Sequence, residues 1–538
     1  MIFDIVYEYQ KYFKSVQRRR KLKMPARKTV EVESSLKEKY MRFLAKGGID
    51  YKQHQYDGVK WCVNNETCVE PVYNVRGGFI ADEMGLGKTI MMIGTMVANF
   101  VPKTLIVVPV MLMQQWWQEI YRTTGHRAMI YHGDAKKWIT LEDIQACPIV
   151  ITTYNTLSLE REKKNKKNVV DSRESSFAMK YGGRGLGGIC LLHDVKWDRA
   201  VFDEGHHLRN KNNRYFGCTQ LKTRIRWIIS GTPIQNRVRD LYNLCNALGI
   251  PSSVYMDEDV RPILGKHFVL RRTKAQLGIA LPALSMDSSS VEWSSQSEKR
   301  LAEHVHKTLH SSPLKIALMT QARKSCILPS MLKPGMNRMV TNHMMSRELF
   351  TEEALSGGGS KLNSVVQTIL DRRNNGAGKL VFCHFREEID VIAGRLKAGG
   401  MENVASFDGR DSKKIRGQKL ANKYDALILQ IQTGCEGLNL QKDYSEIYFV
   451  TPHWNPSVED QAVARCHRIG QSKPVIVFRF EMSGFVDSNF VEERKSPITT
   501  SGVPVNNDNV EVDTLDRYIT LVQQRKRDMV SSIALVSG

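Results

Sequence analysis

The sequence contains no cysteine pair in the C-x-x-C spacing, although ten cysteines are scattered along its 538 residues. This distribution indicates neither a zinc module nor a disulfide framework, so we expect reduced cysteines in an intracellular protein. A signal peptide is not expected either, because Asp4 and Glu8 interrupt the apolar N-terminal stretch.

Uninterrupted apolar runs of membrane-spanning length are also missing. The longest apolar region, residues 90–113, contains Asn99, Pro102, Lys103 and Pro109. These breaks predict a buried helix followed by a buried strand, and they argue against a membrane span. The 42% hydrophobic content is nevertheless enough for two or three domains with cores of their own.

Acidic residues are in short supply, since 78 lysines and arginines face only 56 aspartates and glutamates. The formal net charge of +22 indicates a polyanionic partner, most simply nucleic acid, although a basic but ordinary enzyme is the alternative. A basic run at Arg18–Lys28 is consistent with a nuclear import signal, an electrostatic arm for DNA, or a solvated tail.

Short apolar runs alternate with helix-length segments in two separate parts of the chain, which predicts two successive α/β units with parallel sheets. We expect a basic extension at 1–48, a first lobe at 49–280 with a flexible insertion at 158–195, a helical insertion and linker at 281–359, a second lobe at 360–510, and a C-terminal helix at 511–538.

The stretch ADEMGLGKT, Ala81–Thr89, ends like a phosphate-binding loop. The usual pattern G-x-x-x-x-G-K-[ST] has a glycine where this chain has Asp82. A predicted strand precedes the loop and a predicted helix follows it, which is the context that such a loop requires. Asp82 and Glu83 are expected at the loop entrance, before the turn of backbone amides.

Each later position of this loop has a chemical role to fill. Gly85 and Gly87 allow backbone N–H groups to turn inward toward a phosphate. Lys88 is long enough to reach the β- and γ-phosphates, and the Thr89 hydroxyl is a ligand for Mg²⁺. The loop therefore predicts ATP and Mg²⁺ as cofactors.

A phosphate loop needs an acidic partner from another strand, and the run RAVFDEGHH supplies one. Apolar residues lead directly into Asp203 and Glu204, as at the end of a buried strand. We assign Asp203 to Mg²⁺ and Glu204 to the attacking water, which it would orient or deprotonate. A solvated strand end is the alternative for an Asp-Glu pair by itself.

Several motifs together resemble the Swi/Snf family of DNA-translocating ATPases, within helicase superfamily two. They occur in the family's order between Tyr51 and Ala534: ADEMGLGKT, FDEGHHLRN, SGTPIQN, LRRTK, GLNL and HWNPSVEDQAVARCHRIGQ. The resemblance implies two tandem RecA-like lobes with a helical insertion between them. The family's own loop reads D-E-M-G-L-G-K-T, so Asp82 belongs to the family pattern.

The resemblance also assigns residues outside the loop. Gln55 matches the glutamine of the adenine-reading segment, and Ser230, Gly231 and Thr232 match the motif that couples ATP state to DNA contact. His206 stands where the family transmits that coupling. Together with the loop pattern, this assigns to nucleotide binding Gln55, Asp82, Glu83, Met84, Gly85, Leu86, Gly87, Lys88, Thr89 and Gln461.

Two arginines in the second lobe complete the expected site. Arg465 and Arg468 share one helical face at i, i+3, and in the resembling family these positions are arginine fingers. The lobe-two motif TGCEGLNL retains Gly437 and Asn439, which we expect to couple nucleotide to DNA. It departs from the family at Thr433, Cys435 and Glu436, and a carboxylate beside a DNA backbone would be repulsive.

The resemblance implies an ATPase that is stimulated by double-stranded DNA, translocates along it, and remodels or displaces bound nucleosomes or transcription complexes. A strand-separating helicase and a DNA-binding scaffold with a decayed ATPase are the alternatives. Among the subgroups of the family, this sequence most resembles the lodestar and transcription-release-factor type. Compact viral members of the family also occur. A nuclear or viral replication site is therefore expected, without membrane or zinc-module partners.

Overall fold

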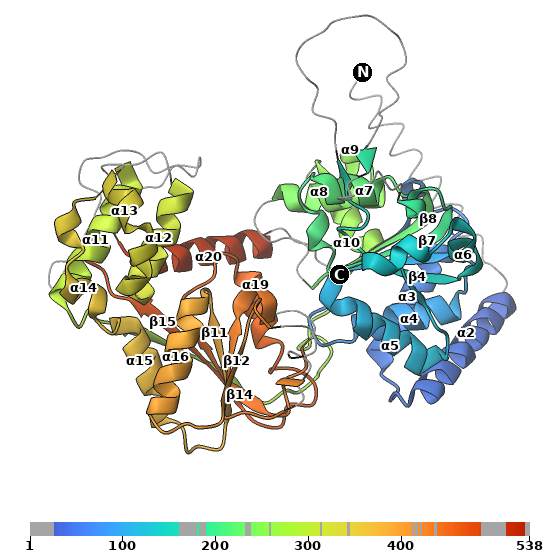
Figure 1. The fold of residues 1–538 in the computed structure, drawn as a ribbon. Coiled ribbons are helices and arrows are strands. Elements are labelled where there is room, and N and C mark those ends of the chain that lie inside the picture. Colours follow the sequence, from blue (N-terminus) through green and yellow to red (C-terminus); the bar gives the residue numbers. More distant parts are fainter. Residues whose placement is uncertain are drawn as a thin grey trace, which may run out of the picture.

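The chain folds into two α/β lobes, each built on a parallel sheet (Figure 1). The computed structural model describes residues 26–160, 180–181, 190–231, 238–257, 260–311, 315–341, 345–411, 415, 418–419, 422–434, 438–485 and 513–532. Within these ranges, no helix is both long and apolar enough to cross a membrane. No group of three or more histidine, cysteine, aspartate or glutamate side chains in the described ranges could hold a metal ion.

Lobe 1 contains a seven-stranded parallel sheet in the order β3-β4-β2-β7-β8-β1-β9. Its central strands are buried on both faces, as a parallel sheet covered by helices requires. The strands are β1 (Arg76–Ile80), β2 (Thr104–Val108), β3 (Met129–Ile130), β4 (Ile149–Thr153), β7 (Trp197–Asp203), β8 (Thr223–Ile229) and β9 (Val269–Leu270).

Helices cover both faces of this sheet and form two hydrophobic cores, one on each side. The helices of lobe 1 are α3 (Gln53–Thr67), α4 (Lys88–Ala98), α5 (Met113–Thr124), α6 (Leu141–Ala146), α7 (Asn213–Thr219), α8 (Val238–Leu248), α9 (Ser252–Tyr255) and α10 (Pro262–Phe268). Because β1 leads into α4 through the predicted phosphate loop, the carboxyl edge of the sheet carries the site.

Two predicted segments at the margins of lobe 1 need correction. The extension at 1–48 includes α2 (Ala26–Gly47), which packs on lobe 1 through Tyr40, Phe43 and Leu44. The expected insertion at 158–195 also ends earlier, because Leu192 and Val195 are buried in the lobe 1 core. A short antiparallel pair, β5 (Leu159–Glu160) with β6 (Lys180–Tyr181), lies within it.

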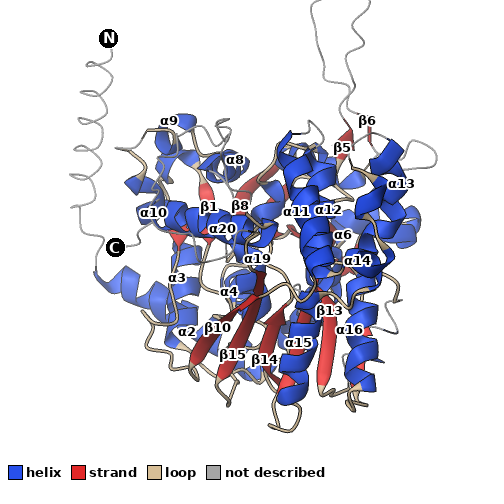
Figure 2. Cartoon of the chain, turned by 90° about the vertical axis from the view of Figure 1, so that its left-hand side faces the viewer, coloured by secondary structure: helices blue, strands red, loops and turns tan. Residues whose placement is uncertain are grey.

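Lobe 2 contains a six-stranded parallel sheet in the order β10-β15-β14-β11-β13-β12. Figure 2 looks onto this sheet, with α15 (Ser360–Asp371) and α16 (Arg386–Ala398) in front of it. The strands are β10 (Leu284–Val291), β11 (Gly378–Cys383), β12 (Val404–Phe407), β13 (Ala426–Gln430), β14 (Tyr444–Phe449) and β15 (Val475–Met482).

The first of these strands corrects the expectation that 281–359 is a helical insertion and linker. β10 is the edge strand of the lobe 2 sheet and pairs with β15 along its whole length. Serines dominate the strand, and most of its side chains are exposed on both faces. Because an edge strand without a buried face does not alternate apolar and polar residues, the sequence did not indicate a strand here.

The rest of the middle segment is helical and packs with the C-terminal helix. Four helices lie here: α11 (Gln296–Ser311), α12 (Lys315–Ile327), α13 (Lys333–Thr341) and α14 (Glu352–Ser356). The C-terminal helix α20 (Leu515–Ser532) buries Leu515 and Ile519 against them. Its Asp516 pairs with Lys361 of α15, and both side chains are fully buried. The helix is thereby fixed to lobe 2.

Candidate nucleotide-binding site

The loop between β1 and α4 has the conformation that its glycines predict. Gly85 has a φ of 91° and Gly87 a φ of 84°, in the left-handed region that favours glycine. A Cβ atom at Gly87 would also collide with the Gln55 side chain. Gln55 is buried, and its Nε2 donates to the carbonyl oxygen of Leu86 at 3.1 Å. Gln55 therefore holds the loop from α3.

The two carboxylates at the start of the loop form ion pairs with the segment that follows β9. Asp82 is fully buried and accepts hydrogen bonds from the backbone N–H of Arg272, at 2.9 Å, and from its guanidinium. Glu83 lies 2.8 Å from Lys274 Nζ. Neither side chain is among the described residues that line the cleft between the lobes. Both instead stabilise the loop by tying it to the segment after β9.

Lys88 begins helix α4, and its ammonium group lies within the loop. Its Nζ donates to the carbonyl oxygens of Asp82 and Glu83, at 2.9 and 3.3 Å. Burial lowers the pKa of Lys88, while the negative charges of Glu204, Asp82 and Asp203 act to raise it. The surrounding carboxylates thus offset part of the cost of burying this cation.

The acidic pair lies at the carboxyl end of β7, beside the loop. Glu204 has a φ of 48°, which is rare for a residue with a side chain and is found at functional sites. Its backbone N–H donates to Asp203 Oδ1 at 2.9 Å. Burial, followed by the charge of Glu204, raises the pKa of Asp203. Burial also acts to raise the pKa of Glu204, but His206, Lys88 and Arg465 together outweigh it and lower the pKa.

Groups from both lobes line one cleft of about 140 Å³. Lobe 2 contributes Asn439, Ala464, Arg465 and Arg468, which face the loop and the acidic pair. A Cβ atom at Gly85 would lie 3.4 Å from the Arg468 Cβ, so the lobes are in contact here. The described residues that line the cleft are Met84, Gly85, Gly87, Lys88, Thr89, Leu112, Gln115, Trp116, Asp203, Glu204, Asn439, Ala464, Arg465 and Arg468.

The charges in this cleft fit a triphosphate. The Nε atoms of Arg465 and Arg468 are buried and have no hydrogen-bond partner among the described residues. Guanidinium and ammonium groups suit phosphate oxygens, while the oxygens of Thr89 and Asp203 suit a hard divalent cation. Asn439 accepts a hydrogen bond from Arg468 Nη1, which links the retained lobe-two motif to an arginine of the cleft.

The remaining predicted residues lie at varying distances from the cleft. Gly231 lies beside Met84 and Lys88, and the Ser230 N–H donates to the Ile80 carbonyl at 3.1 Å. His206 Nδ1 lies 3.2 Å from Glu204 Oε2. Gln461 is buried on α19 (Pro456–Val463) and does not belong to the described lining. Thr232 and Gly437 lie outside the described residues, as do Cys435 and Glu436.

Sequence reasoning missed the segment around the start of α5, where Leu112 just before the helix and Gln115 and Trp116 within it line the cleft. Trp116 is buried, and its Nε1 donates to Asp203 Oδ2 at 2.7 Å. Trp116 and Trp117 are adjacent on α5, and their spacing in the sequence does not indicate which indole faces the acidic pair.

Two parallel-sheet lobes that share one phosphate-binding cleft define the chain as a two-lobed P-loop ATPase. The family descriptions agree with this architecture: the SNF2-related domain matches residues 54–260, and the helicase conserved C-terminal domain matches residues 360–470. The chain belongs to the Swi/Snf family of DNA-dependent ATPases, as its motifs predict.

Relatives of this chain come from viruses and cells. It is 26% identical over 463 residues to a probable global transactivator of Orgyia pseudotsugata multicapsid polyhedrosis virus, covering 79% of this chain and 85% of the relative. It is 24% identical to the CHD3-type chromatin-remodeling factor PICKLE of Arabidopsis thaliana, covering 82% of this chain but 34% of the relative. A solved Sulfolobus solfataricus SWI2/SNF2 ATPase core in complex with dsDNA aligns with a TM-score of 0.35 and 20% identity, over 81% of this chain and 88% of that chain.

Proposed function

We propose that the chain hydrolyses ATP in this cleft to translocate along double-stranded DNA, and thereby displaces or remodels proteins bound to the DNA. The observation that carries the proposal is that the two lobes contribute different groups to one cleft. Lobe 1 supplies the phosphate loop and the acidic pair, and lobe 2 supplies both arginines. Hydrolysis then requires both lobes to be together.

The residues of the cleft have separate tasks in this proposal. Lys88 and the amides of the loop bind the phosphates, while Thr89 and Asp203 would hold Mg²⁺, which would neutralise phosphate charge. Glu204 orients the attacking water and accepts its proton. Arg465 and Arg468 stabilise the charge that develops on the phosphoryl group.

The size of the cleft connects hydrolysis to movement. At about 140 Å³ it is smaller than the roughly 300–1,000 Å³ of most ligand pockets, so we expect the lobes to move apart when ATP enters. Nucleotide contacts with both lobes then favour closure, and loss of the γ-phosphate weakens those contacts. Alternating closure moves the two lobes relative to each other along a bound strand.

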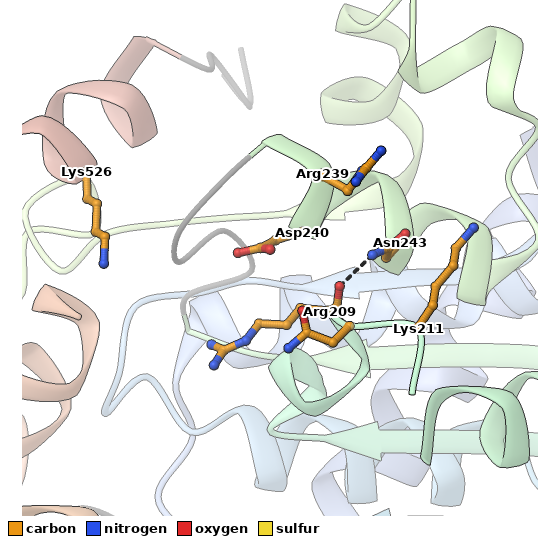
Figure 3. Close-up of a pocket in the computed structure, with 7 residues that line it drawn as sticks. Arg209, Lys211, Arg239, Asp240, Asn243 and Lys526 are labelled. Atoms are coloured by element: carbon orange, nitrogen blue, oxygen red, sulfur yellow. Dashed lines mark hydrogen bonds between the residues drawn. The ribbon is translucent and has the colours of Figure 1, made fainter. Parts of the chain in front are cut away.

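A second cleft, of about 850 Å³, is a candidate surface for the DNA backbone (Figure 3). It lies between lobe 1 and the C-terminal helix α20. Four of its lining residues are basic and one is acidic. The lining residues are Arg209, Asn210, Lys211, Arg239, Asp240, Asn243 and Lys526.

One basic group of this second cleft, Lys526, is placed at an electrostatic cost that a phosphate would relieve. Burial and then the nearby charge of Arg209 lower the pKa of Lys526, while Asp240 acts to raise it. Arg209 Nη1 is buried without a hydrogen-bond partner among the described residues, and Figure 3 shows Arg209 extending toward Lys526. Such contacts would bind any sequence and weaken with salt.

Nucleosomes and transcription complexes are the proposed obstacles, in a nucleus or at a viral replication or transcription site. The names of the two relatives support these settings, since one is a probable global transactivator of a virus and the other a chromatin-remodeling factor. The chain spans only 34% of the plant relative, so further activities of that protein are not assigned to it.

Two assays on the whole chain test the proposal. ATP hydrolysis should rise when duplex DNA is added, and a triplex-forming strand should be displaced while a plain duplex stays paired. Unwinding of the duplex would favour the helicase alternative instead. Hydrolysis that ignores DNA, or no hydrolysis at all, would contradict the proposal.

A further inference from the structure

Both carboxylate oxygens of Asp203, and its backbone carbonyl, accept hydrogen bonds. Its Oδ1 accepts the Glu204 N–H at 2.9 Å, its Oδ2 accepts the Trp116 indole N–H at 2.7 Å, and its backbone carbonyl accepts the Tyr154 hydroxyl at 2.6 Å. A carboxylate oxygen can accept more than one hydrogen bond or ligand, so each oxygen keeps a position for a metal.

The Trp116 contact differs from those of two other tryptophans of lobe 1. The adjacent Trp117 donates its indole N–H to a backbone carbonyl, away from the cleft, at 3.0 Å. Trp227 also donates to a carboxylate, but that carboxylate is Glu66, which is already paired with Arg199. Trp116 alone of these three lines the nucleotide cleft. Satisfying an indole N–H does not require such a partner.

We infer that Trp116 is a positioning residue for the metal of the nucleotide site, which orients Asp203 through the Nε1–Oδ2 hydrogen bond. Trp116 is 1% exposed and packed into a core of lobe 1, so its ring cannot easily turn away. Groups that hydrogen-bond a metal ligand fix its orientation, and their loss typically costs metal affinity or activity about 10- to 100-fold.

This inference rests on the proposed assignment of Asp203 to the metal, and its test needs no turnover and no DNA. The affinity of the whole chain for ADP is measured with Mg²⁺ and with EDTA, and Mn²⁺ binding to the ADP complex is followed by electron paramagnetic resonance. In Trp116→Phe, which removes the N–H but keeps an aromatic ring, metal-dependent tightening and Mn²⁺ affinity should fall about 10- to 100-fold. Metal-free ADP affinity should stay unchanged.

The matched control is Trp117→Phe, which removes an equal amount of ring and a hydrogen bond from the next position of the same helix. It should keep both affinities. Should Trp116→Phe fail to fold, Trp116→His tests the role in the opposite direction, because its ring retains an N–H donor. It should keep most of the metal-dependent tightening.

The outcomes separate this inference from the proposed function. Asp203→Asn should abolish the metal-dependent tightening, and if it does not, the assignment of Asp203 itself is wrong. If Asp203→Asn does abolish it but Trp116→Phe behaves like the wild type, the positioning role is wrong. A loss of ADP affinity that is equal with and without metal would also overturn the inference, because it would indicate general distortion.

Discussion

The two lobes bring their groups to the shared cleft in different ways. In lobe 1 the acidic group is already oriented, since Asp203 accepts hydrogen bonds from Trp116 and from the backbone. In lobe 2 the Nε atoms of Arg465 and Arg468 are buried without partners among the described residues. The lobe 1 half of the site is therefore preorganised. In the lobe 2 half, the arginine Nε groups are available to hydrogen-bond a negatively charged ligand.

This difference implies that the lobes contribute to different steps. A preorganised half binds nucleotide with little rearrangement, so substitutions there should affect binding or folding as well as hydrolysis. A half whose arginine Nε groups have no hydrogen-bond partner among the described residues gains most when charge develops between the lobes. Substitutions in lobe 2 should then reduce turnover while leaving nucleotide affinity nearly intact.

The largest effect is expected from the lobe 2 arginines. Arg465→Ala or Arg468→Ala should reduce ATP turnover by about 10³- to 10⁵-fold, because facing arginines stabilise the charge of phosphoryl transfer. Steady-state hydrolysis and fluorescent-nucleotide binding measure the two effects separately. Arg527→Ala, which removes a largely exposed pair with Asp460 of the same lobe, is the control. A loss confined to nucleotide affinity would contradict the contrast between the lobes.

Next in size is the acidic group of lobe 1. Glu204→Gln keeps the shape of the side chain but removes the base, and turnover should fall by about 10²- to 10⁴-fold. Lys88→Ala should reduce turnover to a comparable extent, and both variants should still bind DNA in a gel-shift assay. Glu142→Gln, on an exposed position of α6, should hydrolyse ATP normally. Near-normal hydrolysis by Glu204→Gln would remove that residue from the site.

The third prediction concerns the ion pair between Asp82 and Arg272, which we expect to stabilise the fold. Arg272→Met leaves the fully buried Asp82 without its cation, so the free energy of unfolding should fall by about 3–5 kcal/mol. Arg42→Met breaks the exposed pair with Glu38 and should change it by less than about 1 kcal/mol. Urea unfolding followed by circular dichroism compares the two. Equal stabilities would mean that the loop does not depend on this ion pair.

The smallest effect is expected at the second cleft. Lys526→Ala should lower DNA affinity modestly for every sequence, and should reduce the slope of log affinity against log salt by about 0.9, the value for one phosphate contact. Arg525→Ala removes the same charge from an exposed neighbouring position of α20 and is the matched control. Identical slopes in the two variants would mean that the second cleft does not bind the DNA backbone.

Much of both lobes could be predicted from local patterns. The apolar runs that predict strands correspond to β1, β2, β4, β7 and β8 in lobe 1 and to β11 through β15 in lobe 2. Such strands are buried on both faces, and their composition reports that burial directly. β10 was missed because this serine-rich edge strand is held mainly by backbone pairing, and only Val291 at its end is buried in the core.

The ion pairs of the loop show a different limit. Asp82 and Arg272 lie 190 positions apart, and no spacing rule connects them. The pair forms because the Ala81 N–H donates to the Leu270 carbonyl, which places the segment after β9 alongside the loop. The sequence placed both carboxylates at the loop entrance, but their partners depended on the order of the strands.

By itself, the sequence determined two α/β lobes, a phosphate loop at the end of a strand, and an acidic pair at the end of another. These follow from glycines and from apolar periodicity, which act within a few residues of each other. Only the tertiary structure decided that Arg465 and Arg468 reach the loop, and that Trp116 rather than Trp117 faces Asp203. Neighbouring helix positions point about 100° apart, and packing between distant segments selects which one turns inward.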